Sequence, residues 1–388
     1  MFKNRDIVCI STINWDFLYQ RHQILMELFA KSGSRVFYLE NINPSPVINL
    51  SLLPKLLKQG RKIFFKPAKA GLSNIRIISP FILPLKNKVA GCINQKVFIK
   101  YLSSYLTGKG VKNPMIWTYL ATSLAIDLIA RLKPSLLIYD CVFDAPLHPS
   151  SPKDIFQSEV KLIRLADAIF TDNSLLLEKC AKINRQSYLI PPGVIFEDFD
   201  QASFLTKTNS FLHIPGPRIC FFGGIDNLRL DLELIRGIAL AKPLWSIILL
   251  GPVIKTDVSL LKLKNVYFRS AVDHSLLGSY LASVDVLILP YKIIPFSNSI
   301  FPAKIFECLA TGKPIVSTPL PQLSLLSRGL IKIAENPKEF IDSITSCLNY
   351  DSDTDKEKRR IAARENSWLK RINEIRRVLN ELPDRKAR

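Results

Sequence analysis

The stretch Ser299–Pro314, SIFPAKIFECLATGKP, decides how the whole chain is interpreted. Its pattern predicts a short helix over 302–311, because proline is favoured at the first helical position and Gly312 suits the position just past the end. Lys304 then falls in the first turn, where the helix dipole disfavours a cation. The residue before the helix, Phe301, has no side chain that could cap the free backbone N–H groups. This helix start is therefore unfavourable unless something negatively charged binds there.

A bound phosphate would satisfy both the helix start and the lysine. Glu307 lies one turn further along on the same face, and a carboxylate can accept hydrogen bonds from two ribose hydroxyls at once. The alternative is an ordinary Lys304–Glu307 surface pair, worth only ~0.2 to 0.5 kcal/mol. The loop 290–299, PYKIIPFSNS, favours the ligand because it is rich in hydroxyls and amides and follows a strand end. We therefore interpret the helix start as a site for a diphosphate.

Apolar, β-branched runs alternate with helical patterns along the chain, which is typical of parallel sheets with helices on both faces. Strands of a first series are expected at 7–12, 34–40, 115–120, 135–142, 168–172 and 187–190, with a first helix at 15–33. Strands of a second series are expected at 218–223, 246–251, 265–268, 285–290 and 314–319. The predicted fold class is α/β, with two Rossmann-like doubly wound domains facing a cleft. We place the domains at 1–200 and 201–365, and we expect a C-terminal helix at 366–388 to pack back onto the first domain.

Composition excludes several classes of protein. The 388 residues are 48% hydrophobic, which suffices for two cores and argues against global disorder. No run reaches the ~18 to 20 apolar residues of a membrane span, and the N-terminal apolar run is too short for a signal peptide, so a cytoplasmic protein is expected. The seven cysteines form no C-x-x-C pair and are expected to be reduced, and the four histidines lack metal-ligand spacing.

The net charge of +20 is unevenly distributed. The segment 41–126 holds no acidic residue, and its basic residues are interspersed with apolar runs such as KIFFK and VFIKYL. Nucleic-acid binding would suit the charge alone. A membrane surface would suit both the charge and the apolar residues, because anionic headgroups attract lysines while leucines and phenylalanines enter the interface. A solvated basic face is the third possibility, but it does not explain the complete absence of acids, so we favour the membrane.

A second candidate anion contact is the pair Gly223–Gly224, which follows an expected strand. Adjacent glycines let the backbone approach a ligand closely and present N–H groups to an anion. The chain has neither a G-x-G-x-x-G nor a G-x-x-x-x-G-K-[ST] motif, so it supports neither a dinucleotide fold nor a P-loop. The alternative is a tight turn between a strand and a helix.

The stretch FPAKIFECLATGKPIVSTPLP resembles the P-x-K-x-x-E-x-L-A-x-G-x-P-V-V segment of glycosyltransferases with the GT-B fold. RICFFGGI, LLGP and SVDVLILPY are similar to their donor domain, and IYDCVFDA, ADAIFTDNS and PPGV to their first domain. The resemblance is strongest to family 4-like and xanthan-glucuronosyltransferase-like enzymes of polysaccharide assembly. It spans most of the chain and is weakest over 45–112.

The resemblance implies roles for individual residues. Lys304 would contact the donor pyrophosphate and Glu307 the ribose, with Gly223 and Gly224 against the diphosphate and Tyr291 near the base or ribose. Ser299 stands where many family 4 enzymes carry a second glutamate near the donor sugar. That departure leaves room for an inverting mechanism, which needs a carboxylate to deprotonate the acceptor hydroxyl.

The candidate base is Asp144 in IYDCVFDA, preferred over Asp140, which would instead cap backbone amides at a strand end. For Asp144 too, capping is the alternative. Trp15 and Arg21 could contact the acceptor, although we favour packing for Trp15 and exposure for Arg21.

The motif Asp198-Phe199-Asp200 resembles the metal–diphosphate D-x-D of another transferase fold, but it lies in a polar connector. We expect its carboxylates to be solvated and no metal or other cofactor to be needed.

The resulting hypothesis is a glycosyltransferase that moves a hexosyl or uronosyl group from a nucleoside diphosphate sugar, with UDP as the expected nucleotide. The expected acceptor is a polyprenyl-diphosphate-linked or other membrane-proximal glycan of polysaccharide biosynthesis. We expect the protein to be cytoplasmic and peripheral on the inner face of the plasma membrane, with an anionic membrane surface and no nucleic acid as its partner. Two alternatives stay open: a nucleotide-sugar epimerase of the same fold, and a non-catalytic basic membrane- or nucleic-acid-binding protein on a decayed transferase scaffold.

Overall fold

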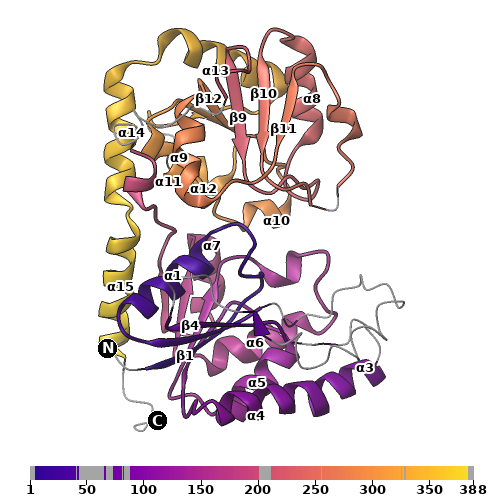
Figure 1. Ribbon diagram of the computed structural model, residues 1–388, viewed down its shortest axis with the longest axis vertical. Helices are drawn as coiled ribbons and strands as arrows, with labels where there is room; N and C mark the ends of the chain where they lie inside the picture. Colours follow the sequence, from indigo (N-terminus) through magenta and orange to yellow (C-terminus); the bar gives the residue numbers. More distant parts are fainter. Residues whose placement is uncertain are drawn as a thin grey trace. The chain divides into compact units, whose positions relative to one another are not determined.

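The computed structural model describes residues 5–40, 42, 65–66, 73–80, 82, 88–200, 211–254, 256–324, 326 and 329–382. The chain forms two compact units (Figure 1), one of Met1–Ile190 with Ile372–Arg388 and one of Pro191–Arg371. The domain boundaries expected from the sequence are 200/201 and 365/366. In the structure, residues just after Pro191 belong to the second unit because Val194 pairs with Ser367 in a parallel bridge.

The first unit is built on an eight-stranded sheet in the order β3-β4-β2-β1-β5-β6-β7-β8. Its pairs are parallel except for β3 with β4. The strands are β1 Asp6–Ile10, β2 Arg35–Leu39, β3 Phe65–Lys66, β4 Ile75–Ile78, β5 Met115–Thr118, β6 Leu136–Cys141, β7 Ala168–Thr171 and β8 Ser187–Leu189. The helices are α1 Arg21–Lys31, α3 Lys88–Ile93, η2 Asn94–Ile99, α4 Lys100–Gly108, α5 Ser123–Leu132, η3 Ala145–Leu147, α6 Ile155–Leu165 and α7 Ser174–Ala181. The strand order reverses between β1 and β5, where ligands of open parallel sheets bind.

The first expected helix was placed too early, at 15–33. Helix α1 begins at Arg21 because Gln20 and Gln23 form a capping box around its first turn. Gln23 also donates through Nε2 to the carbonyl oxygens of Trp15 and Leu18, both at 3.2 Å. These bonds hold residues 15–19 as a loop against the start of the helix. Hydrophobic spacing in the sequence gives no sign of such side-chain hydrogen bonds.

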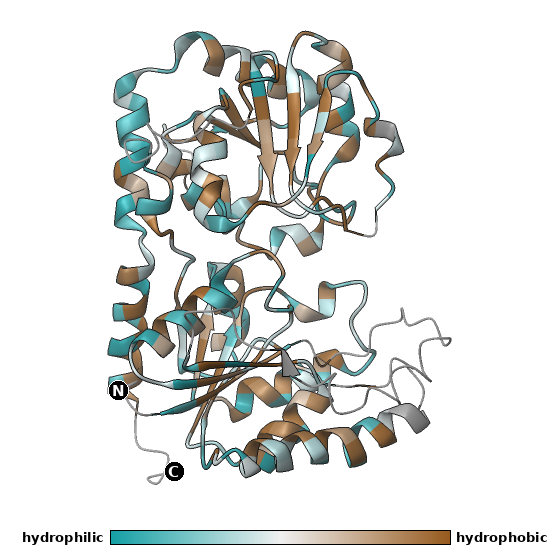
Figure 2. Ribbon diagram, in the orientation of Figure 1, coloured by the Kyte–Doolittle hydropathy of each residue, from teal (hydrophilic) through white to brown (hydrophobic). Residues whose placement is uncertain are grey.

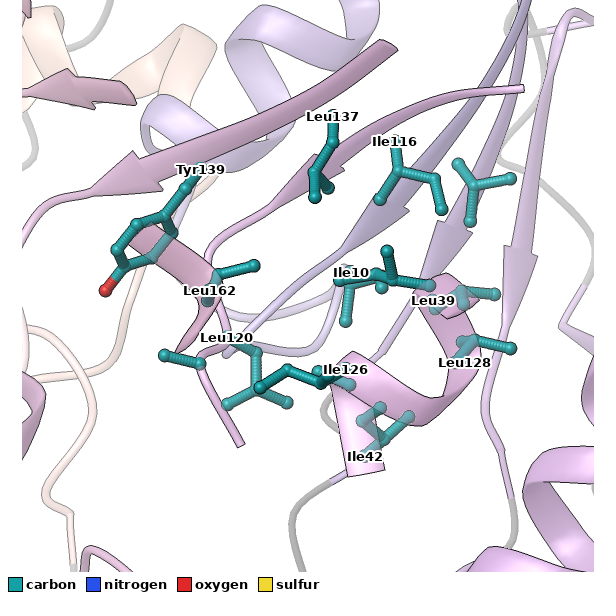
Figure 3. Close-up of a cluster of buried hydrophobic side chains, with 14 of the residues drawn as sticks. Ile10, Leu39, Ile42, Ile116, Leu120, Ile126, Leu128, Leu137, Tyr139 and Leu162 are labelled. Atoms are coloured by element: carbon teal, nitrogen blue, oxygen red, sulfur yellow. The ribbon is translucent and has the colours of Figure 1, made fainter. Parts of the chain in front are cut away.

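One apolar cluster of the first unit lies where one face of the sheet meets helices α5 and α6. Figure 3 shows strand residues such as Ile10 and Leu137 close to Ile126 and Leu162, which come from the two helices. Alternating strand residues point to the same face, so this face is apolar along every central strand. The buried strands of both units appear as hydrophobic bands (Figure 2).

The second unit has a six-stranded sheet in the order β11-β10-β9-β12-β13-β14, and all of its strand pairs are parallel. The strands are β9 Arg218–Phe222, β10 Ser246–Leu250, β11 Val266–Arg269, β12 Val286–Leu289, β13 Ile315–Ser317 and β14 Lys332–Ile333. The helices are η4 Phe196–Asp198, α8 Leu232–Ala241, η6 Ser259–Leu261, α9 His274–Ala282, α10 Pro295–Asn298, α11 Ile305–Thr311, α12 Pro321–Ser324, α13 Pro337–Tyr350 and α14 Asp353–Glu365; α15 Trp368–Glu381 passes from this unit into the first.

Helices cover both faces of the second sheet. Residues of α8 and α13 contribute to one apolar cluster, and residues of α9, α11 and α14 contribute to the other. Both units are therefore doubly wound α/β structures, which confirms the predicted fold class. Among the described residues, no helix is long and apolar enough to cross a membrane.

The segment that begins the second unit packs tightly on the residues before α15. A Cβ atom at Gly193 would lie 2.8 Å from the backbone nitrogen of Trp368 and 2.9 Å from the backbone carbonyl carbon of Ser367. The same backbones are joined by hydrogen bonds from Val194 to Asn366 at 3.0 Å and from Trp368 to Val194 at 3.1 Å. Only glycine therefore fits at position 193 without moving the backbone.

We expect Gly193→Ala to lower the free energy of unfolding by ~1 to 3 kcal/mol, because the added methyl group must push backbone atoms apart. The matched control is Gly237→Ala in α8, where an added Cβ would meet nothing within 4 Å. Alanine is the better helix former, so this control should stabilise by up to ~1 kcal/mol. Urea unfolding of the two variants measures both effects, and equal stabilities would contradict the close packing.

Candidate functional site

The end of the central strand β9 holds a lysine in an unusual setting. Lys304 Nζ donates a hydrogen bond of 2.5 Å to the carbonyl oxygen of Phe222, the last residue of β9. The same nitrogen lies 4.1 Å from the centroid of the Phe221 ring, a cation–π distance. Gly223 has φ +123°, and a Cβ there would lie 2.2 Å from Lys304 Nζ. Glycine is needed both for the backbone angle and for the lysine to reach the strand end.

Burial, and to a smaller extent the neighbouring Arg229 guanidinium, lowers the pKa of Lys304 to about 8. Arg229 is itself held by Asp226, with Nη2 2.5 Å from Oδ2. Lys304 forms no ion pair within the part of the chain that the structure describes. It is thus a partly buried cation at the carboxyl end of a central strand, beside the point where the strand order reverses between β9 and β12.

The helix after Lys304 begins later than the sequence predicted. Helix α11 spans Ile305–Thr311, so Lys304 is its N-cap residue and not part of its first turn. Pro302 starts a preceding turn, in which its carbonyl oxygen accepts the N–H of Ile305 at 2.9 Å. No side chain caps this helix start, as expected, and Gly312 ends the helix with φ +71°.

Glu307 lies in the first turn of α11, but it does not pair with Lys304. Its Oε1 lies 3.2 Å from His274 Nε2, and the other ring nitrogen of His274 lies 3.3 Å from Asp198 Oδ2. Burial opposes the charge on the ring, yet the two carboxylates outweigh it and raise the pKa of His274 to about 9. The spacing of the four histidines in the sequence, considered for metal binding only, did not predict this position for His274.

The two aspartates of the D-x-D motif are ion-paired, which corrects the expectation that they are merely solvated. Asp198 faces His274, and Asp200 accepts from Arg360 at 2.7 Å. The side chains of both aspartates are 30% exposed. The described residues contain no group of three or more histidines, cysteines and acids that could hold a metal ion.

The other residues predicted for the donor site lie on loops of the second unit. The Tyr291 ring centroid is 5.8 Å from Lys304 Nζ, just after β12. A Cβ at Gly224 would lie 2.7 Å from Ile254 Cδ1. Ser299 ends α10, is buried, and donates from Oγ to the carbonyl oxygen of Phe296 at 2.8 Å. The structure thus brings Gly223, Lys304 and Tyr291 together around the end of β9.

In the first unit, Asp140 and Arg21 form a buried ion pair. Arg21 Nε lies 2.9 Å from Asp140 Oδ2, and Arg21 Nη1 donates to the carbonyl oxygen of Ile190 at 2.8 Å. Asp140 also accepts from Trp117 Nε1 at 3.0 Å. The expected exposure of Arg21 was wrong, since its side chain is 6% exposed. Asp140 binds side chains where backbone amides were expected.

Asp144 follows β6 and lies nearer the surface, with 23% of its side chain exposed. Lys179 Nζ lies 2.7 Å from Asp144 Oδ1 and 2.5 Å from Glu159 Oε2. Tyr139 donates to the other oxygen of Glu159 at 2.9 Å. Burial raises the pKa of Glu159, although Lys179 opposes the shift. The lysine thus holds two carboxylates, one buried and one accessible.

Trp15 is buried, as favoured from the sequence. Its backbone N–H donates to Glu40 Oε1 at 3.0 Å, and its ring meets that of Tyr38 edge-on at 4.8 Å. Acceptor contacts by Trp15 and Arg21 stay predictions.

Residues 216–350 match the family described as glycosyl transferases group 1. Over 253 residues the chain is 32% identical to TuaH of Bacillus subtilis (strain 168), a protein assigned to teichuronic acid biosynthesis as a glycosyltransferase. That match covers 60% of this chain and 64% of TuaH, so the chain spans slightly less than two thirds of this relative's length.

Two solved structures share the whole architecture. Sucrose-phosphate synthase from Thermosynechococcus elongatus superimposes with a TM-score of 0.69 at 15% identity, covering 98% of this chain and 99% of that one. Anabaena HepE, solved with UDP and glucose, gives a TM-score of 0.70 at 13% identity, covering 98% and 100%. The chain therefore has the GT-B fold, and residues 216–350 of its second unit are similar to glycosyl transferases group 1, in agreement with the resemblance seen in the sequence.

Proposed function

We propose that the protein is a glycosyltransferase of polysaccharide biosynthesis that uses a nucleoside diphosphate sugar, with UDP as the nucleotide. The observation that carries the proposal is Lys304, a cation without a carboxylate partner among the described residues, placed at the end of β9 against Gly223. Anabaena HepE, with the same fold, was solved with UDP and with UDP-glucose. TuaH, similar over most of its length, is assigned to teichuronic acid biosynthesis.

Lys304 is suited to a diphosphate for an electrostatic reason. An ammonium has three N–H donors, and Phe222 takes one of them. Because burial disfavours the charge, an anion that restores a favourable environment binds the protonated form strongly. In the reaction, the same charge would neutralise the diphosphate as it leaves. This is the role that a metal ion plays in other transferases, and we propose that no metal or other cofactor is needed here.

On the acceptor side, we propose Asp144 as the general base. The acceptor hydroxyl gives its proton to Asp144 while its oxygen attacks the anomeric carbon, and the bond from that carbon to the diphosphate breaks. Such a direct displacement inverts the anomeric configuration. Lys179 would hold Asp144 in place through the 2.7 Å contact to Oδ1. Asp140 is less suited, because its carboxylate is buried between Arg21 and Trp117.

We further propose that the acceptor is linked to a lipid, such as a polyprenyl diphosphate, and that the first unit docks on an anionic membrane surface at the inner face of the plasma membrane. Lys55, Lys58, Arg61, Lys62, Lys69 and Lys86 of the acid-free segment lie outside the described residues. Its described part includes η2 and α4, where Val97, 53% exposed, follows Lys96 and Tyr101, 51% exposed, follows Lys100. Apolar residues recur along α4 in Figure 2.

Helix α6 of the same unit carries further exposed apolar residues, and α5 packs against both α4 and α6. Phe156 is 59% exposed on α6 and lines a shallow depression together with Val160, Lys161, Arg164 and Leu165. Exposed apolar side chains among lysines and arginines match the mixed apolar and anionic character of a membrane interface. A nucleic acid would not require the apolar side chains.

For the donor site, we expect UDP at ~100 times its dissociation constant to add about 2.7 kcal/mol to the free energy of unfolding. Lys304→Met should weaken UDP binding ~10- to 100-fold, as for loss of a charged hydrogen bond, whereas Lys332→Met on β14 should not. Calorimetric titration in the presence of a chelator measures the affinities. Loss of binding with the chelator would contradict the metal-free proposal.

The same titration has an expected pH profile. The diphosphate binds the protonated lysine, so binding raises the lysine pKa, and affinity stays constant between pH 7 and 8, where the terminal phosphate of UDP is ionised. Above the free-protein pKa of about 8, affinity should fall up to ~tenfold per pH unit, and the Lys304→Met variant should lose this fall. A wild-type affinity that is unchanged between pH 7 and 9 would show that Lys304 does not bind the diphosphate.

For the acceptor side, we expect Asp144→Asn to bind UDP normally and to lose ~10²- to 10⁴-fold in sugar transfer to a membrane extract. Its stability should change by ~1 kcal/mol or less, because the pair with Lys179 is partly solvated. Asp140→Ala should instead cost ~3 to 5 kcal/mol, since it leaves the Arg21 guanidinium buried without its carboxylate. Full transfer by Asp144→Asn would exclude it as the base, and turnover of UDP-sugar without any acceptor would favour the epimerase alternative.

For the membrane surface, we expect Lys96→Glu, Lys100→Glu and Lys161→Glu combined to abolish sedimentation with vesicles of anionic phospholipid, at ~1 kcal/mol lost per lysine. UDP affinity should be unchanged. The control carries Arg236→Glu, Lys262→Glu and Lys338→Glu on the second unit, which changes the net charge equally. If both variants are released from the vesicles equally, only the total charge matters. If the wild-type protein binds duplex DNA but not the vesicles, the nucleic-acid alternative is favoured.

A further inference from the structure

His274 begins helix α9, where the helix dipole disfavours a positive charge. Asp273 caps that helix by accepting the backbone N–H of Ser275 at 3.0 Å. The His274 side chain is only 12% exposed, and the Phe199 ring meets it edge-on at 5.5 Å between centroids. A partly buried histidine in this position is costly to charge unless specific groups balance it.

Both ring nitrogens of His274 face carboxylate oxygens. Nε2 lies 3.2 Å from Glu307 Oε1 of α11, and Nδ1 lies 3.3 Å from Asp198 Oδ2 of η4. An ionised carboxylate only accepts hydrogen bonds, whereas a neutral imidazole has a single N–H to donate. The geometry therefore fits a charged imidazolium that donates to both neighbours. The raised pKa of His274, about 9, agrees with this arrangement.

The contact fixes one oxygen of Glu307 and leaves the other available. Oε2 of Glu307 has no hydrogen-bond partner among the residues that the structure describes. The Glu307 side chain is 18% exposed, so a ligand can reach it. A long flexible glutamate loses less rotamer freedom on binding a hydroxyl when it is already held in place. Lys304 does not hold Glu307 in place, because its ammonium donates to the carbonyl oxygen of Phe222.

We propose that His274 is a positioning residue that orients Glu307 toward the ribose hydroxyls of the donor nucleotide, with Asp198 orienting the ring from the other side. The proposal rests on the function proposed above and adds a named source for the recognition of ribose. It also gives Asp198 of the D-x-D motif a role that involves no metal: the aspartate holds a histidine, and the histidine holds the ribose-binding glutamate.

The test compares the dissociation constants of UDP and 2′-deoxy-UDP by calorimetry. Wild type should bind UDP ~10-fold or more tightly than the deoxy compound, as for a hydroxyl bonded to a carboxylate. In His274→Ala, the preference for UDP over 2′-deoxy-UDP should fall to nearly the value of Glu307→Gln. The variant with both substitutions should show no further fall in this preference. Lys304→Met should weaken both ligands alike and keep the ratio. His213→Ala is the control, because His213 is an exposed histidine of the same unit.

The outcomes separate the two proposals. A wild-type protein that binds neither nucleotide contradicts the proposed function. Tight UDP binding with no discrimination against the deoxy compound, or full discrimination by His274→Ala, overturns the role of His274 while the donor site stands. Should His274→Ala fail to fold, Asp198→Asn decides: a ratio reduced several-fold supports the proposal, and a wild-type ratio overturns it. Asp200→Asn, whose aspartate pairs with Arg360, is the matched control.

Discussion

The bond from Lys304 Nζ to the carbonyl oxygen of Phe222 governs the geometry of the second unit's strand ends. It forms only because Gly223 leaves room, and Gly223 in turn lies against another glycine. A Cβ at Gly251, the residue after β10, would fall 2.0 Å from the Gly223 carbonyl oxygen. The ends of β10 and β9 and the start of α11 are therefore stacked at contact distances that side chains would not allow. An anion that enters here meets backbone and ammonium directly.

Arg21 in the first unit and Lys304 in the second are buried charges with different surroundings. In the first unit, the Arg21 guanidinium has a carboxylate and a carbonyl oxygen as partners, and the Asp140 carboxylate has two side-chain donors. A pair satisfied in this way fixes structure and resists change. In the second unit, Lys304 has a carbonyl oxygen, an aromatic face and a nearby arginine, and its pKa falls to about 8. A cation in such an unfavourable setting fits the diphosphate contact proposed above, because an anion would restore a favourable environment for its charge.

The sequence predicted the structural features that depend on neighbouring residues in the chain. Gly312 ends α11 because the left-handed conformation at a helix end favours glycine, and that requirement is visible in the sequence. The start of the same helix was predicted three residues too early. Lys304 precedes the helix and donates to the carbonyl oxygen of Phe222, which lies 82 residues away in the sequence, and such a distant contact leaves no local signal. Arg21 was expected at the surface because its partner, Asp140, is 119 residues distant. Both errors concern polar side chains whose partners come from another strand end, which periodicity does not reveal.

Ser299 shows how far the resemblance to the family extends. Its hydroxyl donates to the carbonyl oxygen of Phe296 within its own turn, and the side chain is buried. A glutamate at this position would need a partner for its charge, whereas serine is satisfied by the turn itself. The region before α11 is therefore built without a carboxylate at this position. The base proposed above for the acceptor hydroxyl, Asp144, lies instead in the first unit, where Lys179 Nζ is 2.7 Å from its Oδ1. A serine in the donor unit and a partly exposed carboxylate in the first unit fit the direct displacement proposed above.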